Sequence, residues 1–135
     1  AGFELKEHVK SFLQNKGYNI KDFGALEYDS LDDYPDFIIP AAKHIAEHNL
    51  IGIIFGGSGQ GEAMAANRIK GIRAAVFYNG PNEIVELSRM HNNANILSIG
   101  ARFLSNQEAE SIIELWLSTD FEEGRHQKRI NKLDS

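Results

Sequence analysis

The stretch Gly56-Gly57-Ser58-Gly59-Gln60-Gly61-Glu62 follows the apolar run Leu50–Phe55 and leads into the helix-forming residues Glu62–Asn67. A continuous apolar run of this kind is typical of a strand that is covered on both faces of a parallel sheet. A glycine-rich turn between such a strand and a helix lies at the carboxyl end of the strand, where open α/β sheets bind their ligands. The stretch therefore predicts both an α/β fold and a ligand-binding loop.

The remainder of the chain alternates helix and strand patterns around this loop, with a turn-rich, acidic segment at 24–34 and with Pro40 expected to bend its helix or delay its start. Apolar spacing, caps and glycine stops predict the other elements. The expected helices are Leu5–Leu13, Pro35–Asn49, Pro81–His91, Ser105–Leu117 and Glu123–Leu133, and the expected strands are Tyr18–Phe23, Leu50–Phe55, Ile72–Phe77 and Asn95–Ile99. This order predicts a three-layer, Rossmann-like α/β fold with helices on both faces of a parallel sheet, in one domain of residues 1–135.

Composition narrows the class of protein. The chain has 135 residues, enough for a buried core, and its 42% hydrophobic content is that of a globular protein. It contains no cysteine, which excludes disulfides, thiolate metal sites and a cysteine nucleophile. A net charge of −5 argues against general nucleic-acid binding, and the apolar runs are too short to span a bilayer. Without a signal-peptide pattern, we expect a cytoplasmic protein with neither nucleic-acid nor membrane partners.

The glycine loop lacks the residues that two familiar phosphate loops require. A dinucleotide site needs an acid at the end of the next strand, where this chain has Tyr78-Asn79-Gly80. A P-loop needs Gly-Lys-Ser/Thr, where this chain has Gly61-Glu62-Ala63. A tight turn without a ligand is the simpler alternative, but four glycines in six residues favour a loop that a ligand approaches closely.

Glu62 indicates the kind of ligand. A carboxylate in the first helical turn repels a phosphate at the same spot, but it suits a carbonyl substrate whose oxygen becomes negative during the reaction. Amides of Gly57, Gly59 and Gly61 would stabilise that oxygen, Ser58 would donate a hydrogen bond to it, and Glu62 would move the proton. The alternative is that Glu62 only complements the helix dipole.

Basic residues elsewhere can bind an anion away from Glu62. Arg102 follows an expected strand, and Arg125 and Arg129 are spaced i, i+4, on one face of a helix. Arginine matches phosphate geometry, although on composition alone a solvated helix end rich in cations is the more common explanation. His91, at a helix end, is either a proton shuttle or a structural residue. We expect no metal, since His8, His44 and His48 lack partners at metal-ligand spacing.

The motifs together resemble the B-type ribose-5-phosphate isomerase family, to which the galactose-6-phosphate isomerase subunits are related. The match covers most of the chain in the right order. The matching segments are Asp33-Tyr34-Pro35-Asp36, the glycine loop with Ala65-Ala66-Asn67, Gly71-Ile72-Arg73-Ala74-Ala75, Ser88-Arg89-Met90-His91-Asn92-Asn93-Ala94-Asn95, Gly100-Ala101-Arg102 and Gly124-Arg125-His126-Gln127-Lys128-Arg129.

This resemblance implies an aldose–ketose isomerase of the pentose phosphate pathway, which interconverts ribose 5-phosphate and ribulose 5-phosphate through a cis-enediolate, without a cofactor. Many members use a cysteine as the base where this chain has Gly56, whereas others resemble this sequence and use a glutamate at Glu62. The resemblance also implies a homodimer, or a tetramer, with active sites shared between subunits. Its further implied roles are ring opening by His91, enediolate contact by Asn92, a sugar-site wall from Tyr34, and phosphate binding by Arg102, Arg125 and Arg129.

One part of the family pattern has no counterpart here. Members open with a strand that ends in Ser-Asp-His just before an Ala-Gly-Phe like Ala1-Gly2-Phe3, and its Asp-His pair contacts the sugar. We expect the sequence to be truncated before Ala1, so that this strand is missing from it. Two alternatives stay open: an isomerase of a six-carbon sugar phosphate, such as allose or galactose 6-phosphate, and a non-catalytic sugar-phosphate-binding protein.

Overall fold

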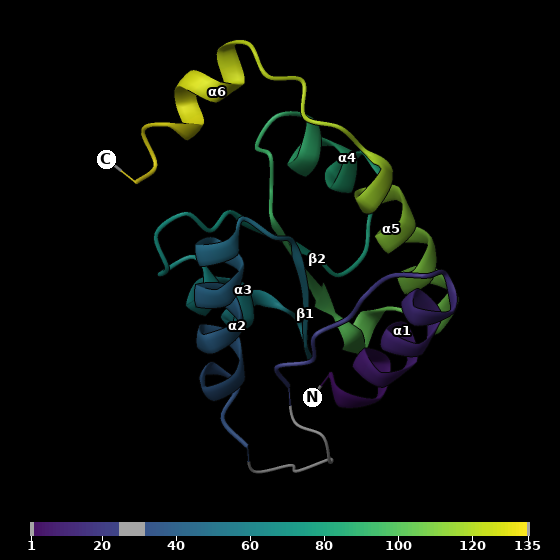
Figure 1. The fold of residues 1–135 in the computed structure, drawn as a ribbon. Helices are drawn as coiled ribbons and strands as arrows, with labels where there is room; N and C mark the ends of the chain where they lie inside the picture. The colour runs from purple at the N-terminus through teal and green to yellow at the C-terminus, as the bar shows by residue number, and fades with distance from the viewer. Residues whose placement is uncertain (1, 25–31, 135) are drawn as a thin grey trace.

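Three parallel strands form the centre of the molecule in the computed structural model, which describes residues 2–24 and 32–134 (Figure 1). They are β1 (Gly52–Gly56), β2 (Ala74–Phe77) and β3 (Ile96–Gly100), in the order β1-β3-β2. β3 pairs with both neighbours, and Gly56 lies opposite Gly100 at the carboxyl edge of the sheet. The predicted strands after residue 50 are therefore confirmed.

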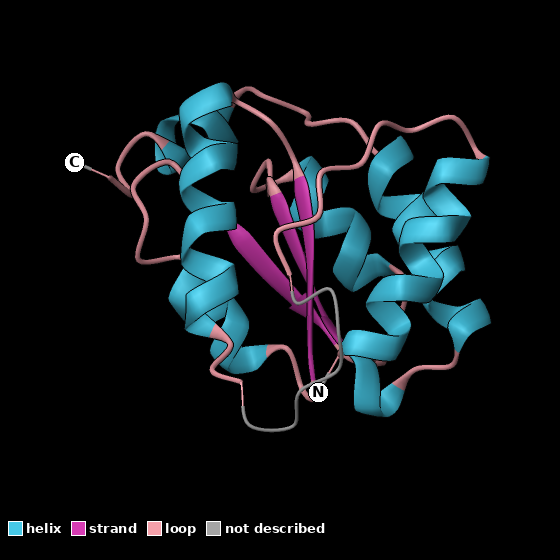
Figure 2. Ribbon diagram, turned by 60° about the horizontal axis from the view of Figure 1, so that its bottom comes forward, coloured by secondary structure: helices cyan, strands magenta, loops and turns pink. Residues whose placement is uncertain are grey.

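Helices cover both faces of this sheet, as Figure 2 shows. One face carries α1 (Phe3–Asn15), α4 (Glu83–Met90) and α5 (Asn106–Ser118), and the other carries α2 (Pro35–His48) and α3 (Gln60–Ala66). A 3₁₀ turn, Ala101–Phe103, follows β3, and α6 (Arg125–Ile130) ends the order. The three-layer α/β prediction is confirmed. None of the described helices combines the length and apolar character that a membrane span requires.

Strand alternation explains why the sheet has a core on each face. Leu97 and Ile99 of β3 pack with α1, α4 and α5 around Trp116, whereas Ile96 packs with α2 and α3. Side chains of adjacent strand residues point to opposite faces, so an apolar strand serves both cores. Ser105 caps α5 through a capping box with Glu108, in which each side chain accepts from the other's backbone amide.

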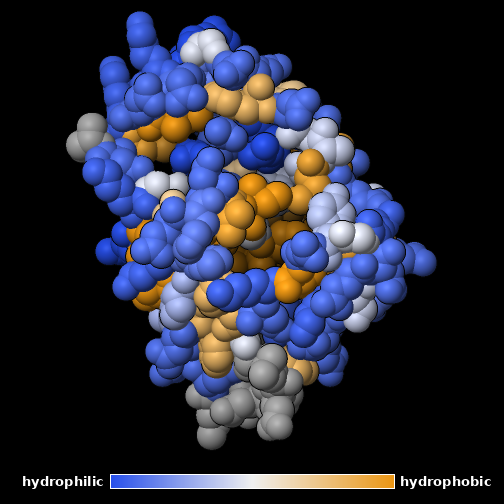
Figure 3. All heavy atoms as spheres, in the orientation of Figure 1, coloured by the Kyte–Doolittle hydropathy of each residue, from blue (hydrophilic) through white to orange (hydrophobic). Residues whose placement is uncertain are grey.

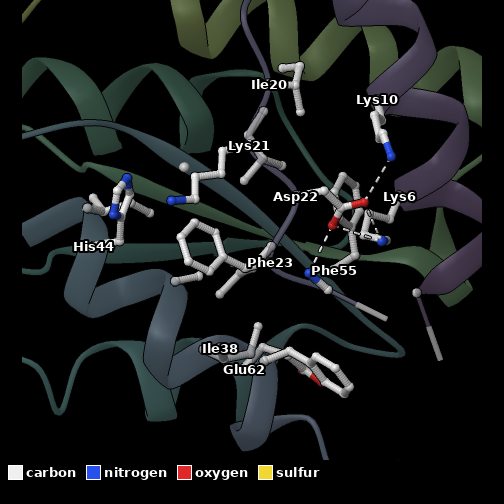
Figure 4. Close-up of a pocket in the computed structure, with 18 of the residues that line it drawn as sticks. Lys6, Lys10, Ile20, Lys21, Asp22, Phe23, Ile38, His44, Phe55 and Glu62 are labelled. Carbon is white, nitrogen blue, oxygen red and sulfur yellow. Dashed lines mark hydrogen bonds and ion pairs between the residues drawn. The ribbon is translucent and has the colours of Figure 1, made fainter. Parts of the chain in front are cut away.

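The prediction of a strand at Tyr18–Phe23 is wrong. This segment is irregular, and a cavity of about 440 Å³ lies between it and β1, so it pairs with no strand of residues 2–24 and 32–134 (Figures 3 and 4). In Figure 3 apolar surface is visible in a hollow near the middle of this face. α1, α2 and the open edge of β1 complete the cavity walls. Of the expected turn segment 24–34, residues 25–31 lie outside the described residues.

Other differences from the sequence expectations are shifts of element ends. Pro40 lies inside a continuous α2 that begins at Pro35, so the late start is wrong. The helix after the loop begins at Gln60, two residues early, and the last helix is shorter than Glu123–Leu133. Single-turn differences of this kind are usual at helix ends.

Asp22 fastens the irregular segment to α1. Its carboxylate accepts hydrogen bonds from Lys6 at 2.9 Å, from Lys10 at 3.1 Å and from the amide of Gly24 at 2.9 Å (Figure 4). Burial disfavours the charged carboxylate, but these donors outweigh it and hold the pKa of Asp22 below its usual value. The segment keeps its position beside the cavity through these bonds rather than through sheet pairing.

Candidate active site

The glycine loop leaves β1 at Gly56 and enters α3 at Gln60. Gly59 has a left-handed φ of +80°, and an added Cβ there would meet Ser98 Oγ at 3.0 Å. The fully buried Ser98 donates a hydrogen bond of 2.6 Å to the Gly59 carbonyl, which also accepts from the amide of Ala63 at 3.1 Å. Ser98 thus fixes the loop from the neighbouring strand. The sequence reasoning missed this residue, although a lone hydroxyl in an apolar strand requires a partner.

The fixed loop presents hydrogen-bond donors. Within the described part of the chain, the backbone N–H groups of Gly59, Gly61 and Glu62 donate no hydrogen bond to another protein atom. Ser58 Oγ accepts from the amide of Gln60 at 3.2 Å, which leaves its own hydroxyl proton to donate. Such an arrangement suits an oxygen that carries negative charge.

Glu62 places a carboxylate beside these donors. Glu62 is only 9% exposed, and it lines the cavity (Figure 4). Tyr34 lines the same cavity. A Cβ built on Gly56 would lie 2.1 Å from Cδ of Glu62, so the carboxyl group packs directly against the glycine backbone. A Cβ on Gly61 would similarly lie 2.7 Å from the hydroxyl of Tyr34. Two glycines therefore make room for the two side chains of the site.

Arg102 completes the group at the carboxyl edge. Its amide donates to the Gly57 carbonyl at 3.0 Å, and its guanidinium lies 3.1 Å from where a Cβ on Gly57 would be. The structure thus brings seven of the expected site residues together. They are Tyr34, Gly57, Ser58, Gly59, Gly61, Glu62 and Arg102.

The other expected site residues lie at the opposite edge of the sheet. His91 and Asn92 precede β3 and therefore stand at its amino end, and Arg125 and Arg129 are exposed residues of α6. Since Gly56 and Glu62 follow the carboxyl end of β1, the described chain does not bring the two groups together. The sequence expectation placed His91 near a sheet edge but did not say at which end of the strands. Both the amino and the carboxyl ends of the strands form such an edge, so the separation was not predicted.

Two arginines hold the segment that carries His91 and Asn92. Arg73 Nε donates to the carbonyls of Asn92 at 3.2 Å and Asn93 at 2.9 Å. Arg89 donates to the Asn93 side chain at 3.1 Å and to the Ala94 carbonyl at 2.5 Å. Burial lowers the pKa of both guanidinium groups, yet each remains charged at neutral pH. No sequence pattern indicates this bracing, because the arginines and the carbonyls come from separate segments.

His91 also contacts α6 and the chain that leads into it. Its ring stacks on that of His126 with centroids 4.2 Å apart, and its Nε2 lies 3.5 Å from Oε1 of Glu122. Burial, the neighbouring His91 and the charge of Arg125 lower the pKa of His126. This histidine therefore favours its neutral form more than a free side chain would.

Fold and site together define an α/β protein with a ligand loop at a strand's carboxyl end and a nearly buried carboxylate within that loop. The family model described as Ribose/Galactose Isomerase matches residues 1–133. Ribose-5-phosphate isomerase B of Mycolicibacterium paratuberculosis is 42% identical over 135 residues, covering 98% of this chain and 84% of that protein.

Solved structures agree with this match. Ribose-5-phosphate isomerase B from Mycoplasma genitalium, determined with bound ribulose-5-phosphate, has a TM-score of 0.92 at 37% identity and covers 98% of this chain and 87% of its own. The Thermotoga maritima enzyme has a TM-score of 0.92 at 41% identity, with 99% and 91% covered. The chain belongs to the ribose/galactose isomerase family and is an isomerase, as its motifs predicted.

Proposed function

We propose that this protein is an aldose–ketose isomerase that interconverts ribose 5-phosphate and ribulose 5-phosphate, with residues 1–135 as one domain. The observation that carries the proposal is the carboxylate of Glu62, held against Gly56 beside the unpaired amides of the glycine loop. The names of the similar proteins, including one solved with ribulose-5-phosphate, support the choice of substrate. As part of this proposal, we place the activity in the cytoplasm.

The chemistry requires one base and a set of hydrogen-bond donors. Glu62 removes the proton from C2 of the open-chain aldose, and the electron pair moves through the C1–C2 bond onto the carbonyl oxygen. The resulting cis-enediolate is stabilised by the amides of Gly57, Gly59 and Gly61 and by the hydroxyl of Ser58. Glu62 then returns the proton to C1, and a hydroxyl proton moves from O2 to O1. Only protons move, so this sequence of steps uses no cofactor.

The phosphate is bound away from the base. A dianion next to Glu62 would oppose its charge, and arginine pairs well with phosphate oxygens. Arg102, Arg125 and Arg129 take this role in the proposal, Tyr34 borders the sugar, His91 assists ring opening, and Asn92 contacts the enediolate. As His91, Asn92, Arg125 and Arg129 stand at the far edge of the sheet from Glu62, we propose that a partner subunit supplies them, in a homodimer or a tetramer of such dimers.

Hydrogen exchange at the sugar tests the reaction and the substrate together. We expect the protein to exchange the C2 proton of ribose 5-phosphate in deuterated water and to form ribulose 5-phosphate, measured by proton NMR. The panel should include allose 6-phosphate and galactose 6-phosphate, because the family description names galactose as well as ribose. Faster turnover of a hexose phosphate would replace the proposed substrate, and binding without exchange on any sugar would contradict an isomerase.

A mixed dimer tests the shared site. Glu62→Gln and the double variant Arg125→Ala/Arg129→Ala should each be nearly inactive at low substrate, since each removes its part from both sites. The mixed dimer contains one chain of each variant and is purified after co-expression with two affinity tags. If each site takes Glu62 from one chain and the arginines from the other, one site carries both changes and the other site carries neither. We expect about half of the wild-type activity there. An inactive mixed dimer, with both chains present by mass spectrometry, would mean that the site is not shared in this way.

A further inference from the structure

Three potential metal ligands meet at the start of α6, away from the glycine loop. His91, Glu122 and His126 each offer one ligand atom, and these atoms all lie within 4.8 Å of one another. No ligand spacing in the sequence indicates this cluster, because His91 lies far along the chain from the other two residues. We propose that this cluster is a binding site for a divalent transition-metal cation, with Zn²⁺ as the best match, contrary to the sequence expectation of no metal.

The distances are close to those of a zinc site. Bonds of 2.0–2.2 Å in a tetrahedron place neighbouring ligand atoms about 3.4 Å apart. Oε1 of Glu122 lies 3.5 Å from Nε2 of His91 and 3.7 Å from Nε2 of His126. In both pairs the two ligand atoms need to approach each other only slightly to reach the distance of a zinc site. The larger change concerns the histidines, whose rings are nearly parallel at 13° and must tilt so that their lone pairs converge.

The surroundings allow that tilt while fixing one ligand. The His126 side chain is only 10% exposed, whereas those of His91 and Glu122 are 40% and 52% exposed and have room to rotate. The backbone is already fastened, since the amide of Glu122 donates to the Met90 carbonyl at 3.0 Å. The two segments that carry the ligands therefore need not move relative to each other.

The donor set selects the kind of cation. Two imidazoles and one carboxylate suit Zn²⁺, Co²⁺ or Ni²⁺, whereas Mg²⁺ prefers oxygen ligands alone. Three protein ligands leave a fourth position for water, as in zinc sites that are open to solvent. The nearby charges of Arg125 and Arg129 oppose a cation, and the carboxylate of Glu122 offsets part of that repulsion.

Direct binding is the primary test. Titration calorimetry of the metal-free protein with ZnCl₂, and the visible spectrum of added Co²⁺, should show one ion per chain and no response to MgCl₂. Glu122→Gln, a change on an exposed side chain, should weaken Zn²⁺ binding at least about 100-fold. The control is His48→Asn, which breaks another close histidine pair, with ring centroids 4.3 Å apart, that belongs to no metal cluster among the described residues.

His48→Asn should bind Zn²⁺ as the wild type does. No zinc binding by the wild type, or equal binding by wild type and Glu122→Gln, would overturn the site. An equal loss in His48→Asn would overturn it as well, because the zinc would then be held by surface histidines in general.

A second arm connects the site to activity, and this arm rests on the proposed function. If His91 assists ring opening, Zn²⁺ bound to it should inhibit isomerisation, and excess chelator should restore the rate. Glu122→Gln should resist inhibition at zinc concentrations that inhibit the wild type. Zinc binding without inhibition would leave the metal site in place and contradict the role of His91, so the two proposals fail separately.

Discussion

Glu62→Gln is expected to lower kcat for the isomerisation by about 10²–10⁴, the usual cost of removing one acid–base group. The amide keeps the size of the side chain, so the packing against Gly56 and the phosphate contacts of the arginines should persist. KM should therefore change little, and ribose 5-phosphate should still bind, as measured by calorimetry or by thermal stabilisation. Loss of C2 proton exchange in deuterated water would locate the defect in proton transfer.

A matched variant separates chemistry from helix stability. Glu83→Gln removes one of the two first-turn acids of α4, an exposed carboxylate that, like Glu62, lies at the positive end of its helix dipole. If Glu62 served only the dipole, both variants would lose about 0.3–1 kcal/mol of stability and neither would lose activity. Wild-type turnover in Glu62→Gln would exclude the proposed base and leave that explanation.

Gly56→Ala is expected to reduce kcat by about 10² or more, although the added group is one methyl. Its Cβ would lie 2.1 Å from Cδ and 2.2 Å from Oε1 of Glu62, so the carboxyl group has to leave its position. A displacement of about 1 Å in a catalytic group can cost 10² in rate. Steady-state kinetics measure the loss, and circular dichroism with thermal unfolding checks that the variant folds.

The control for Gly56→Ala is a double-mutant cycle. In a Glu62→Ala background the carboxyl group is gone, so the added methyl should change the residual rate and the stability much less than in the wild type. The two changes should then be strongly non-additive, as expected for residues in contact. Additive effects would mean that Gly56 acts through the strand itself and not by making room for Glu62.

This contact also gives a physical reason why the base that we propose is Glu62 and not a residue at position 56. The resemblance implies that many relatives have a cysteine at the position of Gly56. In this structure the carboxyl group of Glu62 occupies the volume that any side chain at position 56 would enter. A side chain there and the present position of Glu62 exclude each other, so a glycine at 56 accompanies a glutamate at 62.

The sequence by itself predicted the α/β alternation and the glycine loop, because both depend on local patterns. Apolar runs such as Leu50–Phe55 and turn residues such as Gly59 depend on near neighbours in the chain. Where a pattern needed a distant partner, the prediction failed: Tyr18–Phe23 alternates like a strand, but it pairs with no strand among the described residues. The hydrogen bonds of a sheet join separate segments of the chain. The alternation of apolar and polar residues in one segment does not show whether a partner strand lies beside it.

Only the tertiary structure decided how the chemical groups are shared between the two edges of the sheet. Ser98 of β3 donates a hydrogen bond to the Gly59 carbonyl, and Gly56 makes room for Glu62. Both contacts depend on distances in space that the spacing of residues along the sequence does not specify. The direction of β3 places His91 at the edge opposite Glu62, next to Glu122. A parallel sheet sends the residues before and after each strand to opposite ends of the molecule, so direction in space determines which residues meet.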